Sequence, residues 1–274
     1  MFRKTSGAIL CPSCGRLTTA DARECLVCGR RNPGMWGFAG PLRNLFRRRS
    51  FVDLVTIACL ALYIASLIFD PRAALQPSGL FNIFSPSVEA LFALGATGAV
   101  PWTLGRWWTL LTAIYLHGGI LHILFNILWI RQLGPAVEET YGPSRLVVIF
   151  TVAGAVGFVA SNFVGHPFTI GASGSIFGLL GAMVAFGRKR GGTFGAMVFR
   201  EYGQWALMLF ILGFLMPGVN NIAHAGGFVG GLAAGFVLAL AERRAETGLD
   251  QLLAAACMGL TLLGFALAFY TALI

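Results

Sequence analysis

The sequence predicts an all-α polytopic membrane protein that is preceded by a short polar segment bearing cysteines. Of the 274 residues, 57% are hydrophobic and only 11% are charged, a composition that a soluble domain does not tolerate. Seven apolar windows each approach the roughly 20 residues that a spanning helix needs, and this length excludes a β-barrel. The first 50 residues are not a basic stretch followed by an apolar one, so we do not expect a cleavable signal peptide.

The positions of the basic residues predict the orientation of the chain. The predicted spans cover residues 51–69, 118–138, 144–164, 171–187, 201–217, 221–241 and 250–273. If the N-terminus is cytoplasmic, all of the 20 Lys and Arg residues except Arg72 and Arg106 fall on the cytoplasmic side. The positive-inside rule therefore predicts an integral protein of the cell (inner) membrane, with its N-terminus in the cytoplasm and its C-terminus outside.

Four cysteines near the N-terminus form two C-x-x-C pairs, each followed by glycine. They are Cys11, Cys14, Cys25 and Cys28. Four thiolates in this arrangement suit tetrahedral zinc, although two disulfides or a redox pair would give the same pattern. The predicted cytoplasmic position favours zinc, because disulfides are rare there. We therefore expect a zinc-ribbon-like domain over residues 1–32, a basic linker over 33–50 and a transmembrane domain over 51–274.

Polar side chains within the apolar spans mark the candidate functional site, because such groups cost free energy in a membrane. His122 and Asn126 are four residues apart near the outer end of the second span, so they share one helical face. A lone histidine at such a position is more often structural. A histidine with an asparagine on the same face is better suited to donating hydrogen bonds into a cavity.

Ser173 stands at the start of the predicted fourth span, just after a polar loop. The start of a helix is its positive pole, where free N–H groups can bind developing negative charge. Gly171 and Gly174 leave room for a substrate backbone beside the hydroxyl group. Alone, this segment does not distinguish a nucleophile from the small-residue packing surfaces of ordinary membrane helices.

His224 lies at the start of the glycine-rich sixth span. The spacing of four between its glycines predicts a flat face that packs against the glycine face of the fourth span. The glycines expected to pack are Gly171, Gly174, Gly227 and Gly231. Because the fourth and sixth spans both begin at the outer surface, Ser173 and His224 lie at similar depth and can meet.

Taken together, the three motifs resemble the signature of rhomboid intramembrane serine proteases, in the same order and on the expected spans. The resemblance covers residues 51 to about 241. It implies a six-helix core, a seventh C-terminal transmembrane helix and a partly embedded outer loop over residues 70 to about 117. It also implies that Ser173 is the nucleophile and His224 the general base, with His122, Asn126 and the Ser173 N–H in the oxyanion hole.

Two positions depart from the rhomboid pattern. Thr109 follows Trp108 where an arginine is common, while Arg106 precedes the tryptophan pair. Phe177 stands where a tyrosine often stacks on the base; it can stack but cannot donate a phenolic hydrogen bond.

The chemistry expected from these residues is that of a dyad. A serine hydroxyl needs a neighbouring base, and imidazole suits this role. None of the 11 acidic residues is predicted inside a span at the depth of Ser173 and His224. We expect no cofactor for catalysis and a purely structural zinc. The expected partners are the lipid bilayer and membrane-protein substrates with helix-destabilising residues in a transmembrane segment, and we expect no nucleic acid.

Two other functions remain open. One is a catalytically inactive rhomboid-like protein that binds or escorts membrane clients. The other is a transporter or channel in which His122, Asn126 and His224 form a polar path, although the sequence lacks buried acids for a proton relay and has no halved internal repeat. Cleavage of a model substrate separates the protease from both.

Overall fold

The computed structural model describes residues 5–11, 16–34, 50–74, 84–238 and 246–273, and the chain divides into two compact units, Met1–Asp53 and Leu54–Ile274. In the first unit, β1 (Ala8–Leu10) and β2 (Leu17–Thr19) form an antiparallel hairpin. Helix α2 begins at the end of this unit. The predicted basic linker over 33–50 lies largely outside the described residues.

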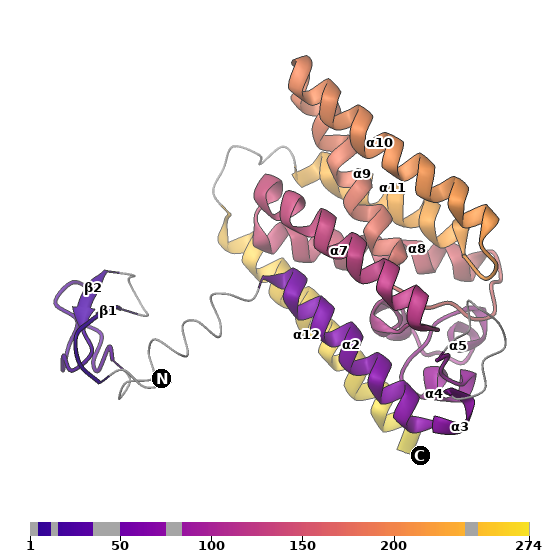
Figure 1. Cartoon of the computed structure of the whole chain (residues 1–274), viewed down its shortest axis with the longest axis horizontal. Coiled ribbons are helices and arrows are strands. Elements are labelled where there is room, and N and C mark those ends of the chain that lie inside the picture. Colours follow the sequence, from indigo (N-terminus) through magenta and orange to yellow (C-terminus); the bar gives the residue numbers. More distant parts are fainter. Residues whose placement is uncertain (1–4, 12–15, 35–49, 75–83, 239–245, 274) are drawn as a thin grey trace. The chain divides into compact units, whose positions relative to one another are not determined.

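Seven long helices occupy the regions of the seven predicted spans (Figure 1). They are α2 (Phe51–Phe69), α7 (Ile120–Tyr141), α8 (Pro143–Phe163), α9 (Ser173–Arg190), α10 (Gly192–Leu215), α11 (Asn221–Leu238) and α12 (Gly248–Leu273). Five of them, α2, α7, α8, α11 and α12, are long and apolar enough to cross a membrane. The prediction of an all-α polytopic membrane protein is confirmed.

Helix α9 forms the centre of the membrane unit. All of its residues from Gly174 to Gly187 are buried, and it contacts α7, α8, α10 and α11. Figure 1 shows α9 enclosed by these helices. Only its last turn, Arg188 to Arg190, is charged. A helix buried on all sides has to be small or apolar throughout, which is why the glycine-rich sequence of α9 suits this position.

Short helices form within the described residues between α2 and α7. These are α3 (Pro71–Ala74), α4 (Val88–Ala93), α5 (Ala99–Thr103), α6 (Thr109–Thr112) and the 3-10 helix η3 (Ala113–Tyr115). Side chains from α4 and from residues just after α4 and η3, among them Leu91, Leu94 and Leu116, form a buried apolar cluster. This part of the chain, called the outer layer below after its predicted side of the membrane, therefore packs around an apolar cluster.

Among the helix boundaries that differ from the sequence-based prediction, glycines explain the starts of α9 and α10. The fourth span was expected to begin at residue 171, but Gly171 has a φ of 116° and α9 begins at Ser173. The fifth span was expected to begin at residue 201, but α10 begins at Gly192. Gly191 and Gly192, both with positive φ, reverse the chain directly after α9, so residues 192–200 of the loop predicted over 188–200 are helical.

Candidate active site

Ser173 is the first residue of α9, at the end of the helix where backbone N–H groups lack intrahelical acceptors. The preceding residues are held by the outer layer, because the Gly171 N–H donates to the Ala113 carbonyl oxygen at 2.9 Å. This bond fixes the chain two residues before the serine. The hydroxyl group is thereby presented beside N–H groups that can stabilise a developing negative charge.

His224 in the first turn of α11 faces Ser173. Its Nε2 lies 2.9 Å from Ser173 Oγ, and its Nδ1 lies 3.2 Å from Asn221 Oδ1. Because an amide oxygen can only accept, Nδ1 carries the ring proton and Nε2 is left to accept the proton of the serine hydroxyl. This is the hydrogen-bonded arrangement that activates a serine nucleophile.

Two contacts hold the His224 ring in place. Phe177, one turn after Ser173 on α9, stacks on the imidazole with ring centroids 4.4 Å apart and planes inclined by 18°. Asn221, one turn before His224 on α11, accepts from Nδ1. The sequence analysis expected stacking by Phe177 but assigned no role to Asn221. The signal available was its spacing of three residues from His224, which places both on one helical face.

Glycine contacts bring the two helices close enough for this pair to form. A Cβ atom at Gly227 would lie 2.1 Å from the Gly174 carbonyl oxygen, and one at Gly231 would lie 1.9 Å from that of Gly178. No residue larger than glycine fits either position without moving the helices apart. Gly171, expected on this packing face, lies instead in the turn before α9, where a Cβ atom would lie 2.6 Å from His122 Nε2.

His122 and Asn126 both lie on α7, and the structure brings His122 beside the chain that leads to Ser173. His122 Nδ1 accepts the Gly118 N–H at 3.3 Å, so its Nε2 is the donor nitrogen, and it faces Gly171. Asn126 Nδ2 donates to the His122 carbonyl oxygen at 2.7 Å, and Asn126 Oδ1 is buried without a partner among the described residues.

His117 is a buried polar residue for which the sequence analysis gave no role. Its ring lies 5.0 Å from that of His122, it is fully buried, and neither ring nitrogen has a hydrogen-bond partner within the described part of the chain. Burial, and secondarily the neighbouring His122, hold the pKa of His117 well below its usual range. His117 is therefore neutral at physiological pH.

A buried network of hydroxyl and amide groups connects the outer layer to the start of α11. Asn220 Nδ2 donates to Ser161 Oγ at 2.6 Å and to Thr169 Oγ1 at 2.9 Å, while Asn220 Oδ1 accepts the Ala223 N–H at 3.0 Å. Asn220 thus caps the helix that carries His224. The cap is tied to α8 and to the chain before α9, so the position of His224 depends on three segments at once.

Thr109 lies in the outer layer, at the position where an arginine is common in rhomboids. Its hydroxyl group is buried, donates to the Arg106 carbonyl oxygen at 2.6 Å and lies 3.1 Å from Thr97 Oγ1. Thr97 in turn accepts from Asn162 Nδ2 at 3.2 Å. Short hydroxyl contacts therefore stabilise the outer layer at Thr109.

The part of the chain that carries these residues matches a known protein family. A family model described as the rhomboid domain matches residues 104–241, a range that contains the Ser173–His224 pair and both α7 residues. This chain belongs to the rhomboid family. The prediction made from the three motifs is confirmed at the level of the family.

Several named rhomboid proteins are similar in sequence to this chain. The chain is 39% identical over 163 residues to the rhomboid protease GluP of Bacillus subtilis, covering 57% of this chain and 31% of that protein. It is 31% identical over 150 residues to the putative rhomboid protease YdcA of the same organism, covering 51% of this chain and 71% of YdcA. It is 35% identical over 187 residues to RHOMBOID-like protein 5 of Arabidopsis thaliana, covering 64% and 58%. The chain thus spans about a third of the length of GluP and nearly three fifths of the length of RHOMBOID-like protein 5.

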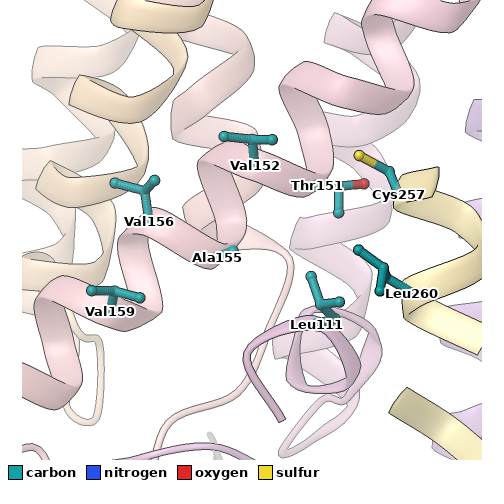
Figure 2. A pocket seen from close by; sticks show the side chains of 8 residues that line it. All are labelled: Leu111, Thr151, Val152, Ala155, Val156, Val159, Cys257 and Leu260. Atoms are coloured by element: carbon teal, nitrogen blue, oxygen red, sulfur yellow. The ribbon is translucent and has the colours of Figure 1, made fainter. Parts of the chain in front are cut away.

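An apolar groove on the surface of this rhomboid lies apart from the Ser173–His224 pair. It runs between α6, α8 and α12, has a volume of about 240 Å³ and is lined almost entirely by aliphatic side chains (Figure 2). Its lining residues are Leu111, Thr151, Val152, Ala155, Val156, Val159, Cys257 and Leu260. The lining offers no acid, base or nucleophile pair for chemistry.

In the N-terminal unit, three of the four predicted metal ligands lie together. The Sγ atoms of Cys11, Cys25 and Cys28 are within 4.8 Å of one another, with 3.7 Å between Cys11 and Cys28. Cys14, the fourth predicted ligand, lies outside the described residues. The cluster has the composition and spacing of a site that can bind a metal ion.

Proposed function

We propose that this rhomboid is an intramembrane serine endopeptidase that cleaves membrane proteins with a Ser173–His224 dyad. The observation that carries the proposal is the 2.9 Å approach of His224 Nε2 to Ser173 Oγ between the starts of two helices. The description of GluP as a rhomboid protease supports the same reaction class. A binding protein would not need a base hydrogen-bonded to a serine hydroxyl at a helix N-terminus.

In the proposed reaction, His224 Nε2 takes the proton of Ser173 as Oγ attacks the scissile carbonyl carbon. The imidazolium then donates this proton to the leaving amine, and a water molecule hydrolyses the acyl-enzyme by the same steps. Asn221 and Phe177 keep the ring aligned throughout. No cofactor is needed for any step.

The negative charge on the tetrahedral intermediate would be held by the Ser173 N–H and by side chains from α7. His122 suits this role because its donor nitrogen faces the chain just before Ser173. Asn126 has one amide hydrogen engaged with His122 and a second one available for a ligand. Loss of one oxyanion donor typically lowers kcat by about 100- to 1,000-fold.

Substrates of this site would be membrane proteins whose transmembrane segments contain helix-destabilising residues. A peptide bond within a regular helix is shielded by its own hydrogen bonds, so the segment has to extend before Ser173 reaches the carbonyl group. We place Ser173 near the outer face of the cell membrane, since the basic end of α9 is at the opposite, cytoplasmic side. A reporter that is active only outside the cytoplasm, fused after Ile274, tests this orientation.

Cleavage of a single-span model substrate in liposomes tests the proposed function. Ser173→Ala and His224→Ala should abolish cleavage, and a fluorophosphonate probe should label the parent protein but not Ser173→Ala. The matched control is Ser175→Ala, a change of the same size two residues further along α9. Ser175 Oγ is buried without a partner among the described residues, so its removal should leave cleavage unchanged. Equal cleavage by all of these variants would refute the proposal.

We further propose that the N-terminal cysteines bind one structural zinc ion. The first cysteine of each pair makes a matching backbone hydrogen bond: the Cys11 N–H donates to the Arg16 carbonyl oxygen at 2.8 Å, and the Cys25 N–H donates to that of Arg30 at 2.9 Å. The 3.7 Å between two Sγ atoms is close to the roughly 3.8 Å edge of a tetrahedral zinc–thiolate site. Elemental analysis of the purified protein should find one zinc per chain, lost in Cys25→Ser, with cleavage by the membrane unit retained.

A further inference from the structure

Helix α12 lies outside the part of the chain matched by the family model, yet one of its ends is fixed to the core by a dense set of polar contacts. Arg145 near the start of α8 donates to Asp250 through Nε at 3.1 Å and through Nη2 at 3.0 Å. Both side chains are buried. Such a two-point contact fixes direction as well as distance.

The residues just before α12 complete this junction. Glu246 accepts the Ser144 N–H at 2.6 Å and the Ser144 hydroxyl at 2.8 Å, and so supplies the cap that the start of α8 lacks. Thr247 and Asp250 cap α12 reciprocally, with Thr247 N–H to Asp250 Oδ2 at 2.7 Å and Asp250 N–H to Thr247 Oγ1 at 3.3 Å. The register of α12 against α8 is therefore set at this end.

The other half of α12 packs against the outer layer. Gly264 faces α6: a Cβ atom there would lie 3.2 Å from Thr112 Cγ2 and 3.3 Å from the Trp108 carbonyl oxygen. Phe265 contacts Tyr115 with ring centroids 5.9 Å apart. At the far end, Arg106 Nη2 lies 3.4 Å from Thr271 Oγ1.

The residues that α12 contacts in α6 are connected by hydrogen bonds to the candidate active site. Thr112 Oγ1 donates to the Gly95 carbonyl oxygen at 2.6 Å, which ties α6 to the rest of the outer layer. The next residue, Ala113, accepts the Gly171 N–H at 2.9 Å. Gly171 lies two residues before Ser173, and a Cβ atom there would lie 2.6 Å from His122 Nε2. A short chain of contacts thus runs from Gly264 through Thr112 and Ala113 to the nucleophile.

We propose that α12 is a brace that positions the segment leading into Ser173, with Gly264 as its principal positioning residue. Its fixed end at Arg145 and Asp250 sets how far Gly264 approaches α6, and α6 sets where the Ala113 carbonyl oxygen holds Gly171. The brace touches neither the substrate nor the dyad. It rests on the proposed protease function, since its effect is on the geometry of that reaction.

The experiment compares the same substitution at two glycines of α12. Gly264→Leu places a side chain against Trp108 and Thr112, whereas Gly259→Leu points into open space with no atom within 4 Å. Both changes alter helix propensity and hydrophobicity equally. Gly264→Leu should lower kcat and the rate of fluorophosphonate labelling at least about tenfold with KM within about twofold, because small misplacements of reacting groups cost rate and not binding. Gly259→Leu should match the parent protein in all three measurements.

Equal kcat for the two leucine variants, with Ser173→Ala inactive, would overturn the brace and leave the protease intact. Cleavage by Ser173→Ala would instead overturn the proposed function. If Gly264→Leu does not fold, Gly264→Ala and Gly259→Ala decide, because the 3.2 Å contact of a Cβ atom requires only a slight shift. Gly264→Ala should lower kcat by less than Gly264→Leu does. Adding Thr112→Ser, which removes the opposing methyl group and keeps the hydroxyl, should restore the kcat of Gly264→Ala. Equal kcat for the two alanine variants would also overturn the brace.

Discussion

Gly227→Ala is the smallest substitution that should separate the two halves of the candidate dyad. A Cβ atom at this position would lie 2.1 Å from the Gly174 carbonyl oxygen and 3.0 Å from Gly174 Cα. The shortest regular contacts between carbon and carbonyl oxygen are roughly 3.3 Å. Relief of the clash therefore requires α11 to move away from α9 by roughly 1.2 Å at this level.

This movement would act almost directly on the dyad. Ser173 adjoins Gly174, and His224 is one turn before Gly227 on the same face of α11. The 2.9 Å contact between them would lengthen beyond the roughly 3.2 Å over which a base takes up a proton. A misplacement of about 1 Å costs about 100-fold in rate, equivalent to about 2.7 kcal/mol in the activation barrier.

The assay is cleavage of a single-span substrate in liposomes, with thermal unfolding followed in parallel. Gly203→Ala is the matched control, because a Cβ atom at Gly203 on α10 would have no other atom within 4 Å. Alanine favours a helix over glycine by about 1 kcal/mol at either site, so a loss of helix propensity cannot explain lower activity. A kcat for Gly227→Ala within twofold of that for Gly203→Ala, in folded protein, would refute this account of the helix contact.

Two further predictions concern side-chain contacts. Asn221→Ala should lower kcat about 10- to 100-fold with little change in KM, because His224 loses the acceptor that orients its ring; Asn221→Asp keeps an acceptor oxygen and should retain more activity in the same cleavage assay. Arg145→Met should destabilise the protein by about 3 kcal/mol, because it leaves the carboxylate of Asp250 buried without its counter-charge. In thermal unfolding, Arg145→Met with Asp250→Leu should recover most of that loss, and a double variant no more stable than Arg145→Met would contradict the mechanism.

The fold was largely predictable from the sequence because a membrane imposes one strong requirement, a continuous apolar helix for each crossing. The boundaries were less accessible, since they depend on single backbone conformations. Gly171 lies within an apolar run whose composition predicts a helix. Its φ of 116° is not helical, so the loop includes Gly171 and α9 begins only at Ser173. Likewise, the fifth span was expected to begin only after Arg200, although charged residues at a membrane surface do not interrupt a helix.

The candidate site was predictable only where its residues follow a repeat or a known motif. Glycines spaced by four on α11 indicated a close helix contact, and the structure places Gly227 against Gly174. By contrast, the contact between Arg145 and Asp250 joins residues 105 positions apart with no pattern to connect them. The role of Asn221 depends on where α11 begins and on how the His224 ring is oriented. Hydropathy and residue spacing predict neither of these.

The choice of a neutral partner for His224 follows from the surroundings of the dyad. Moving a carboxylate from water into a low-dielectric interior costs several kcal/mol unless other charges or donors satisfy it. Asn221 provides the same directional acceptor for the Nδ1 proton without that cost. An amide dipole stabilises an imidazolium less than a carboxylate does, so in the proposed reaction the positive charge on His224 would be stabilised less than it is in a triad. The opposite, negative charge on the oxyanion would be stabilised separately, by the helix N-terminus at Ser173 and by the donors on α7.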